Sequence, residues 1–217
     1  MMRSFALYVV TDEVVSGGRS HLECARGAIA GGADVVQLRE KERPSGEILA
    51  IARDIRAAAV ASGTLLILND RLDIALAAGA DGVHLGQDDL PVAVARRIAP
   101  RPFLIGASVG CVAEALRAER EGADYVAVSP VYSTVSKVDA GPGHGLETVA
   151  SVRGAVRIPV IGIGGIGPVN APDVIGAGAD GCAVISAVLA RPDVAEASRS
   201  LREIIVSALE ERRARSA

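Results

Sequence analysis

The chain has 217 residues, a formal net charge of −3, and a composition that is 50% hydrophobic but only 2% aromatic. Domains that bind nucleic acids usually carry a basic stripe interleaved with aromatic residues, and this sequence contains none. No apolar run approaches membrane-spanning length, and the first one, 5–10, is too short for a signal peptide. Small-molecule partners are therefore expected, with neither nucleic acid nor a membrane among them.

Eight short apolar runs predict buried strands, and a segment long enough for a helix follows each of them. In chain order they are 6–11, 35–40, 65–69, 82–86, 103–107, 125–129, 160–164 and 182–185. Four runs come after the triplet Gly-Ala-Asp, whose copies end at Asp34, Asp81, Asp124 and Asp180. Glycine can end a helix in the left-handed conformation and aspartate favours a turn, so each triplet predicts a turn from helix to strand. Eight such units predict an α/β fold, a (β/α)8 TIM barrel that forms a single domain over residues 1–217.

This architecture separates chemistry from stability, because the active sites of such barrels lie on the loops that follow the strands. The four triplet aspartates precede strands and are expected to be structural. Two histidines, His21 and His144, are expected at the surface, and His84 is expected to be a barrel residue with satisfied hydrogen bonds. Three cysteines, odd in number and without metal-ligand spacing, predict free thiols in a reducing cytoplasm: Cys24, Cys111 and Cys182.

The second strand continues as Gln37-Leu38-Arg39-Glu40-Lys41. Side chains alternate along a strand, so Gln37, Arg39 and Lys41 share one face. Burying an unpaired guanidinium is costly, and Arg39 should therefore meet an anion. That anion is either an acid on a neighbouring strand, in a structural ion pair, or the phosphate or diphosphate of a ligand in the barrel mouth.

Acidic residues follow the third and fourth strands, in Asn69-Asp70-Arg71 and Gln87-Asp88-Asp89. Neighbouring strands lie about 4.8 Å apart, so acids just beyond their ends can meet on one hard cation. Magnesium fits this pattern better than zinc, because there is no cluster of cysteine or histidine. Either acid alone could instead cap a helix, and the spacing does not choose between Asp88 and Asp89.

Two further stretches on the same face could bind anions. The segment 129–145 lacks helical or strand periodicity, and its Lys137 could close on a phosphate or could simply be a surface lysine of a solvated loop. The seventh strand ends in Gly164-Gly165 and the eighth in Ile185-Ser186, where backbone N–H groups commonly bind a phosphate in barrels of this class. Two anion sites on one rim predict two phosphorylated substrates.

In combination these motifs resemble the thiamine phosphate synthase family over nearly the whole chain, 8–186. The motifs that support this are Gln37-Leu38-Arg39-Glu40-Lys41, Asn69-Asp70-Arg71, His84-Leu85-Gly86-Gln87-x-Asp89 and Gly162-Ile163-Gly164-Gly165-Ile166. The resemblance implies a transferase of thiamine biosynthesis. It would join 4-amino-2-methyl-5-(diphosphooxymethyl)pyrimidine to a thiazole phosphate, giving thiamine phosphate and diphosphate. It also implies one Mg²⁺ per subunit, and it leaves a homo-oligomer open.

The resemblance assigns roles to individual residues by position. The pyrimidine diphosphate is expected to contact Gln37, Leu38, Arg39, Glu40, Lys41, Asn69, Ser108 and Lys137. The thiazole phosphate is expected to contact Thr134, Val135, Ser136, Gly165, Ile185 and Ser186. Magnesium is expected on Asp70 and Asp89, a choice that comes from the family pattern. The implied catalytic residues are Arg39, Lys137 and Ser108.

The implied chemistry is a dissociative substitution at the pyrimidine methylene, in which negative charge grows on the leaving diphosphate and needs cationic stabilisation. No protein base is required, because the attacking thiazole nitrogen has no proton to lose. One alternative is a thiazole tautomerase of the same fold, whose family pattern has a histidine where this chain has Val128-Ser129-Pro130-Val131. The other is a barrel that binds a phosphate metabolite without catalysis. Retention of the charged site residues argues against both.

Overall fold

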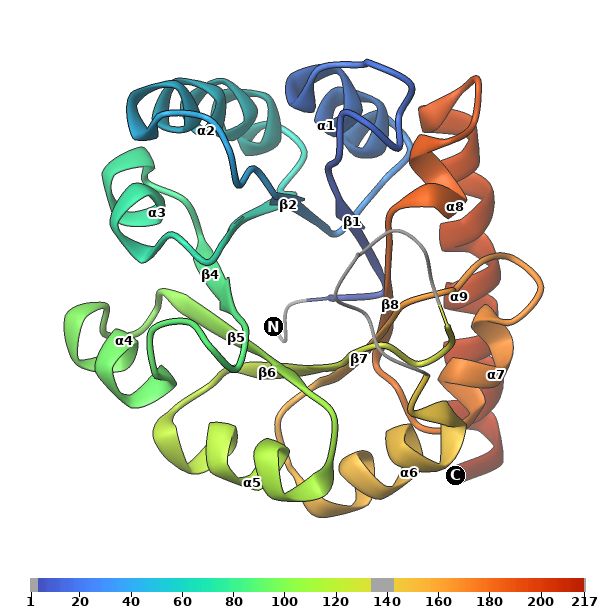
Figure 1. Cartoon of the computed structure of the whole chain (residues 1–217). Coiled ribbons are helices and arrows are strands. Elements are labelled where there is room, and N and C mark those ends of the chain that lie inside the picture. Colours follow the sequence, from blue (N-terminus) through green and yellow to red (C-terminus); the bar gives the residue numbers. More distant parts are fainter. Residues whose placement is uncertain (1–3, 134–142, 217) are drawn as a thin grey trace.

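A computed structural model describes residues 4–133 and 143–216. Within this part of the chain, eight parallel strands close into a barrel in the order β1-β2-β3-β4-β5-β6-β7-β8, and helices form an outer ring around it (Figure 1). The prediction of an α/β TIM barrel is therefore confirmed. None of the helices in these residues is long and apolar enough to cross a membrane.

Each strand pairs in parallel with its two neighbours, and most strands are buried on both faces. The strands are β1 (Leu7–Val10), β2 (Val35–Leu38), β3 (Leu65–Asn69), β4 (Gly82–Leu85), β5 (Leu104–Val109), β6 (Tyr125–Val128), β7 (Val160–Ile163) and β8 (Gly181–Val184). The helices are α1 (His21–Ala30), α2 (Ser45–Val60), α3 (Leu72–Ala78), α4 (Val92–Ile98), α5 (Val112–Glu121), α6 (Gly145–Ala155), α7 (Ala171–Gly176), α8 (Ser186–Leu189) and α9 (Val194–Ser216).

Most strand ends lie within one residue of the sequence prediction, but two differ by two residues, and both of these differences shape the rim. Strand β2 ends at Leu38, two residues earlier than expected, so Arg39 and Lys41 leave the sheet and reach the mouth. Strand β5 extends to Val109, because Ser108 and Val109 continue the ladder with Ala127 and Val128 of β6. Ser108 therefore projects from a rigid strand. Its position does not depend on a loop.

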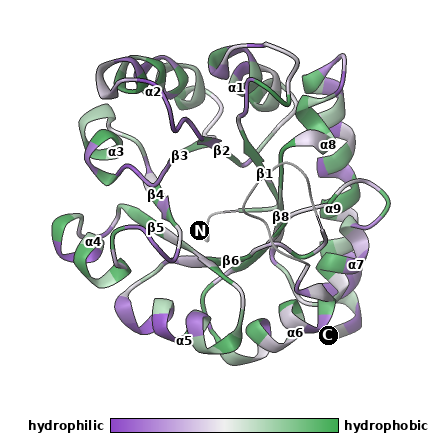
Figure 2. Ribbon diagram, viewed as in Figure 1, coloured by the Kyte–Doolittle hydropathy of each residue, from purple (hydrophilic) through white to green (hydrophobic). Residues whose placement is uncertain are grey.

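The core is aliphatic, as the composition requires, with a few aromatic rings inside the barrel. Figure 2 shows largely hydrophobic strands inside helices that carry both hydrophobic and hydrophilic residues. Tyr8 and Tyr125 are among the largest fully enclosed side chains. Gly106 makes room for the second of them, since a Cβ atom at this position would lie only 2.1 Å from Cζ of Tyr125. The free thiols of Cys24 and Cys182 are also buried.

The four triplet aspartates share one role at the amino ends of the strands. Each carboxylate accepts a hydrogen bond from a backbone N–H of the odd-numbered strand before it, over distances of 2.8–3.0 Å. The pairs are Asp34 with Leu7, Asp81 with Leu66, Asp124 with Ile105, and Asp180 with Val160. Each carboxylate also forms an ion pair with a helix arginine, in the same order Arg202, Arg56, Arg96 and Arg153. The expectation that these aspartates are structural is confirmed.

Asp124 provides the most enclosed test of this arrangement, because it and Arg96 are each only 14% exposed. Replacing Asp124 by alanine removes the carboxylate that neutralises the largely buried Arg96 guanidinium and that accepts the Ile105 N–H, which is expected to lower the free energy of unfolding by about 2–4 kcal/mol. Arg101 pairs with the other oxygen of Asp124 at 3.2 Å but is 63% exposed, so Arg101→Ala should cost less than about 1 kcal/mol. Urea denaturation measures both, and equal losses would contradict the proposed role of the buried pair.

Candidate active site

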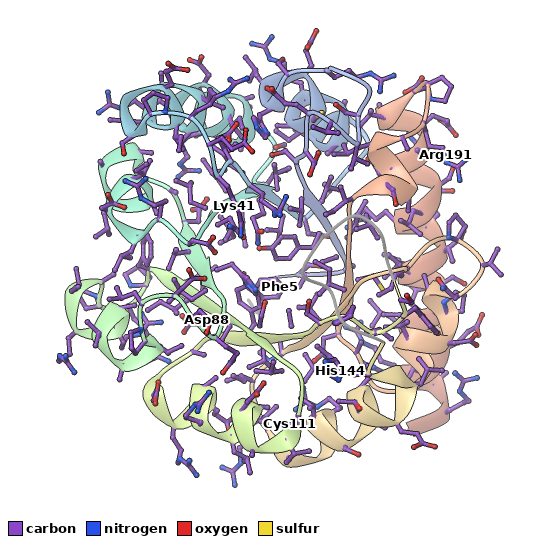
Figure 3. All side chains as sticks on the ribbon, viewed as in Figure 1. Phe5, Lys41, Asp88, Cys111, His144 and Arg191 are labelled. Atoms are coloured by element: carbon purple, nitrogen blue, oxygen red, sulfur yellow. The ribbon has the colours of Figure 1, made fainter. Side chains whose placement is uncertain are left out.

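A cavity of about 450 Å³ opens at the carboxyl ends of strands β2 to β6. Figure 3 shows three of its lining side chains, Lys41, Asp88 and His144, arranged around the centre of the barrel. The full lining is Arg39, Lys41, Asn69, Asp70, His84, Gly86, Gln87, Asp88, Asp89, Ser108, Val109, Gly110, Glu114, Ser129, Pro130 and His144. The cavity thus unites residues that the sequence predicted for an anion and for a metal.

Arg39 forms the structural ion pair that was one of the two interpretations left open by the sequence, and its side chain also lies where the other interpretation requires it. Its Nη1 lies 3.2 Å from Oδ2 of Asp12, the residue that follows β1 by two positions, so a structural ion pair exists. The same side chain, 19% exposed, lines the cavity. The carboxylate of Asp12 therefore holds the guanidinium at the wall of the cavity, and its remaining donors can face an anion there.

Asp70 reaches the cavity through an unusual backbone conformation. Its φ is 63°, in the left-handed region that costs energy for any residue with a side chain, although aspartate tolerates it better than most. Its N–H donates to the carbonyl of His84 over 2.9 Å, which continues the ladder between β3 and β4 while the chain turns. The carboxylate then lies 3.8 Å from Nζ of Lys41. Strain of this kind is often retained where a side chain must be aimed at a site.

The acids after β4 lie in the same cavity. Oδ2 of Asp89 accepts the Gly86 N–H over 2.6 Å, so this carboxylate folds back over its own loop, and Asp88 lines the cavity beside it. Among the described residues no three histidines, cysteines or acids gather closely enough to hold a metal by themselves. Magnesium needs only one or two carboxylates when water and phosphate oxygens complete its coordination. The donor set of Asp70 and Asp89 fits such an ion.

A chain of hydrogen bonds joins five polar side chains, two of which, His84 and Ser108, line the cavity, while the other three lie in the barrel interior. In spatial order they are Gln37, Tyr8, Tyr125, His84 and Ser108, and successive members lie 2.6–3.1 Å apart. Both ring nitrogens of His84 have partners, Tyr125 Oη and Ser108 Oγ, which confirms that it is a satisfied barrel residue. Desolvation raises the pKa of both tyrosines well above the usual value, so both hydroxyls stay protonated.

The structure corrects the expectation that His21 is a surface residue. A capping box between Ser20 and Glu23 fixes the start of α1 and turns His21 inward, where it is 3% exposed. Its Nδ1 lies 2.7 Å from Oγ1 of Thr11, and its Nε2 lies 3.3 Å from Oε2 of Glu40. Partial burial alone would raise the pKa of Glu40. The backbone N–H groups of the following loop and the His21 ring outweigh that burial and lower this pKa below its usual value.

Several predicted residues lie away from the cavity lining. Leu38 is 1% exposed in the barrel wall, and Glu40 points toward α1. Gly165 has a φ of 64°, and a Cβ atom there would lie 2.8 Å from the carbonyl oxygen of Ser133, so close packing of the loop after β6 also requires glycine. Ile185 is buried, whereas Ser186 is exposed at the start of α8. Four predicted residues lie outside the described ranges: Thr134, Val135, Ser136 and Lys137.

The sequence prediction missed some residues of the cavity. Glu114 accepts the Gly110 N–H over 2.7 Å, and the His144 ring lies so close that a Cβ atom on Gly110 would be 2.9 Å from its Nε2. His144 is exposed as expected, but it faces the cavity. Asp12 and His144 could both be predicted from their position in the sequence. Asp12 directly follows the first predicted strand, and His144 lies in the segment after the sixth, and both segments belong to the catalytic rim.

Comparisons with known proteins agree with this geometry. Residues 7–188 match the family model described as thiamine monophosphate synthase. The thiamine-phosphate synthase of Methanoculleus marisnigri is 58% identical over 209 residues, which cover 96% of this chain and 99% of that protein. That of Moorella thermoacetica is 51% identical over 207 residues, covering 95% and 99%. The solved structure of thiamine phosphate pyrophosphorylase from Pyrococcus furiosus superposes with a TM-score of 0.89 at 42% identity, covering 95% and 98%.

The burial of His21 yields a stability prediction with a matched control. His21→Ala leaves Thr11 and Glu40 without a buried partner and is expected to lower the free energy of unfolding by about 1–3 kcal/mol. His144→Ala removes an exposed ring and should change it by less than about 0.5 kcal/mol. Chemical denaturation of both variants tests this, and an unchanged His21→Ala protein would show that the ring does not stabilise the ends of β1 and β2.

Proposed function

Because the chain belongs to the thiamine monophosphate synthase family, we propose that its rim cavity binds the pyrimidine diphosphate and that the loops after β6, β7 and β8 bind the thiazole phosphate. The protein is a transferase of thiamine biosynthesis that condenses a pyrimidine and a thiazole moiety. Its substrates are small phosphorylated molecules. The observation that supports the placement best is the meeting of Arg39 and Lys41 with Asp70 and Asp89 in one cavity.

The cationic side of the cavity suits a leaving diphosphate. The guanidinium of Arg39 is oriented by Asp12 and presents a planar set of donors, which matches phosphate oxygens better than a point charge. Lys41 contributes a second positive charge from the same segment, with Asn69 beside it. Gln37, Ser108 and Lys137 complete the proposed set around the pyrimidine diphosphate, whereas Leu38 and Glu40 support it through the backbone and the barrel wall.

Asp70 and Asp89 would hold one magnesium ion per subunit. When bound, the ion would supply positive charge to the diphosphate as the carbon–oxygen bond breaks. Nζ of Lys41 lies 3.8 Å from Oδ2 of Asp70. Lys41 can therefore stabilise the charge of the Asp70 carboxylate, or turn from it to a bound anion. Neither acid needs to exchange a proton in this role, since both act as oxygen donors.

The residues of the chain are proposed to act on charge and orientation. Arg39 and Lys137 stabilise the negative charge that develops on the leaving diphosphate, and Ser108 donates a hydrogen bond beside the pyrimidine. The aminopyrimidine ring can delocalise the positive charge left on its methylene, which favours a dissociative path. The cavity walls hold this methylene facing the thiazole nitrogen, so that capture is fast relative to diffusion. No general base enters the scheme.

The second anion site is proposed on backbone and hydroxyl groups. Gly165, Ile185 and Ser186 follow β7 and β8, and in the sequence Thr134, Val135 and Ser136 come directly after Ser133, whose carbonyl oxygen packs closely against Gly165. Barrels often bind a phosphate after strands seven and eight. Placing the two anions on different strands keeps their charges apart and leaves the reacting carbon and nitrogen between them.

The two alternatives lose support on different grounds. Relatives that are 58% and 51% identical over almost the whole chain are named thiamine-phosphate synthase, which sets the tautomerase interpretation aside. A barrel without catalytic function would not need the two cations Arg39 and Lys41 and the two acids Asp70 and Asp89 in one cavity.

We further propose that residues 1–217 form one domain and that the protein works in the cytoplasm, where its three free cysteines would stay reduced.

The metal assignment predicts that substitution of Asp89 lowers turnover and metal binding much more than substitution of its neighbour Asp88. Asp70→Asn and Asp89→Asn are each expected to lower turnover at least ~100-fold and to weaken Mn²⁺ binding measured by electron paramagnetic resonance in the presence of inorganic diphosphate. Asp88→Asn, next to Asp89 in the same cavity, is the matched control and should change both by less than about threefold. Full activity in EDTA, or equal effects of the Asp88 and Asp89 substitutions, would contradict the assignment.

The two-site arrangement predicts opposite effects of two substitutions. Arg39→Lys replaces a planar fork by a point charge and should weaken binding of the pyrimidine diphosphate at least about tenfold, with little effect on the thiazole phosphate. Ser186→Asp places a negative charge at the exposed start of α8 and should do the reverse. Separate calorimetric titrations of each ligand measure both effects. Equal losses of both ligands in both variants would indicate one shared phosphate site.

A further inference from the structure

The hydrogen-bonded chain under the cavity crosses the interior of the barrel between two residues that the proposed function places against the pyrimidine substrate. Gln37 Nε2 donates to Tyr8 Oη at 2.6 Å, and this oxygen lies 3.0 Å from Tyr125 Oη. Tyr125 Oη lies 3.1 Å from His84 Nδ1, and His84 Nε2 lies 2.9 Å from Ser108 Oγ. The five residues come from β2, β1, β6, β4 and β5. Their exposure falls to 0–2% at the two tyrosines in the middle.

The surroundings of the chain keep its geometry fixed. The ring of Phe5 lies 5.1 Å from that of Tyr125, and the His84 ring lies 5.6 Å from it on the other side, measured between centroids. Gly106 has no side chain and allows the Tyr125 ring to fill the wall. The Tyr125 ring therefore cannot leave its partners by a simple rotation, and Tyr8 is itself almost completely buried, at 2% exposed. In a dry interior a hydroxyl that loses its partner is costly, so each proton is held in one bond.

Counting protons shows that the two ends of this chain are coupled. Each tyrosine has one hydroxyl proton, and burial raises the pKa of both tyrosines enough that neither loses it. A neutral imidazole has one donor nitrogen and one acceptor nitrogen. If Tyr8 accepts from Gln37, its own proton must go to Tyr125, whose proton then goes to Nδ1 of His84. Nε2 of His84 then bears the hydrogen and donates it to Ser108.

The imidazolium form does not fit the same chain. With both nitrogens protonated, Tyr125 would accept from His84 as well as from Tyr8, and its own proton would have no acceptor within the five residues. For a neutral imidazole, reversing every bond is the one other arrangement in which both tyrosine protons are bonded within the chain. It would require Gln37 to present its oxygen to Tyr8, and it would make Ser108 a donor to His84. The direction of the chain therefore decides what Ser108 can offer to a ligand.

We propose that Tyr8, Tyr125 and His84 are positioning residues that form a one-way relay from Gln37 to Ser108 and so hold Ser108 as a hydrogen-bond donor toward the substrate. In this direction Ser108 Oγ accepts from His84, and its own proton is left for an acceptor in the cavity, such as a ring nitrogen or a diphosphate oxygen. At the other end, the carbonyl oxygen of Gln37 is left to accept from the exocyclic amine. The inference rests on the proposed binding of the pyrimidine diphosphate in this cavity.

The tautomer of His84 tests the relay without any catalysis. Long-range nitrogen-15 NMR distinguishes the two nitrogens of each ring, and the chain has only three histidines to assign. His84 is expected with hydrogen on Nε2, and hydrogen on Nδ1 in the wild-type protein would overturn the proposal. Gln37→Glu, recorded where its carbon-13 shift shows a carboxylate, can only accept from Tyr8 and should move the hydrogen to Nδ1. In a Tyr8→Phe background the same substitution should leave the tautomer as Tyr8→Phe alone has it.

Turnover tests the functional consequence through a double-mutant cycle. Tyr8 and Ser108 are separated by two residues of the relay, so a structural role of Tyr8 would act independently of Ser108. Tyr8→Phe is expected to lower kcat about tenfold in the wild-type background and less than twofold in Ser108→Ala, with circular dichroism confirming folding of all variants. Equal effects in both backgrounds would overturn the proposal. If the wild-type protein formed no thiamine phosphate, the proposed function would fail while the tautomer result would still stand.

Discussion

The fold depends on four partly buried carboxylates that connect the amino ends of its strands to its helices. At its amino end, a parallel strand has a backbone N–H group that the neighbouring strand cannot satisfy. In a closed barrel such unsatisfied groups occur all around the end of the barrel where the strands begin. The triplet aspartates satisfy such a group in β1, β3, β5 and β7, and the arginines of α2, α4, α6 and α9 neutralise the charge that these aspartates introduce. Each of these four strands is thus connected through an aspartate to a helix, at the end of the barrel opposite the cavity.

Much of this architecture could be predicted because it is encoded locally. Glycine after a helix and aspartate before a strand have the same meaning wherever they occur, so four copies, together with the four apolar runs that do not follow a copy, predict eight units. Strand ends were harder. Strand β2 stops at Leu38 because charged residues cannot continue a doubly covered strand, whereas Ser108 stays in β5 because its hydroxyl finds His84. That partner comes from another strand, and alternation along one strand cannot reveal it.

The candidate site shows the same division between local and distant information. Spacing was sufficient to place Arg39, Lys41, Asp70 and Asp89 at one rim, since the carboxyl ends of parallel strands meet there. It could not show that Asp12 would orient Arg39, nor that His21 would turn inward, because both facts depend on contacts between β1, α1 and the segment after β2. Which side chain a residue contacts depends on the tertiary structure. Arg39 forms an ion pair with Asp12 and also lines the cavity, so the structural interpretation does not exclude the proposed functional one.

Gly106 illustrates how a residue without any polar side-chain atom can belong to a site. It lies in the wall of the barrel, paired with His84 of β4, and is not itself part of the cavity lining, yet the Tyr125 ring occupies the space where its side chain would be. A methyl group there would push the ring away from both Tyr8 and His84. Substitutions of Gly106 are then expected to reduce activity as substitutions at the rim do. Distance from the ligand alone would group this glycine with core residues whose substitution leaves activity unchanged.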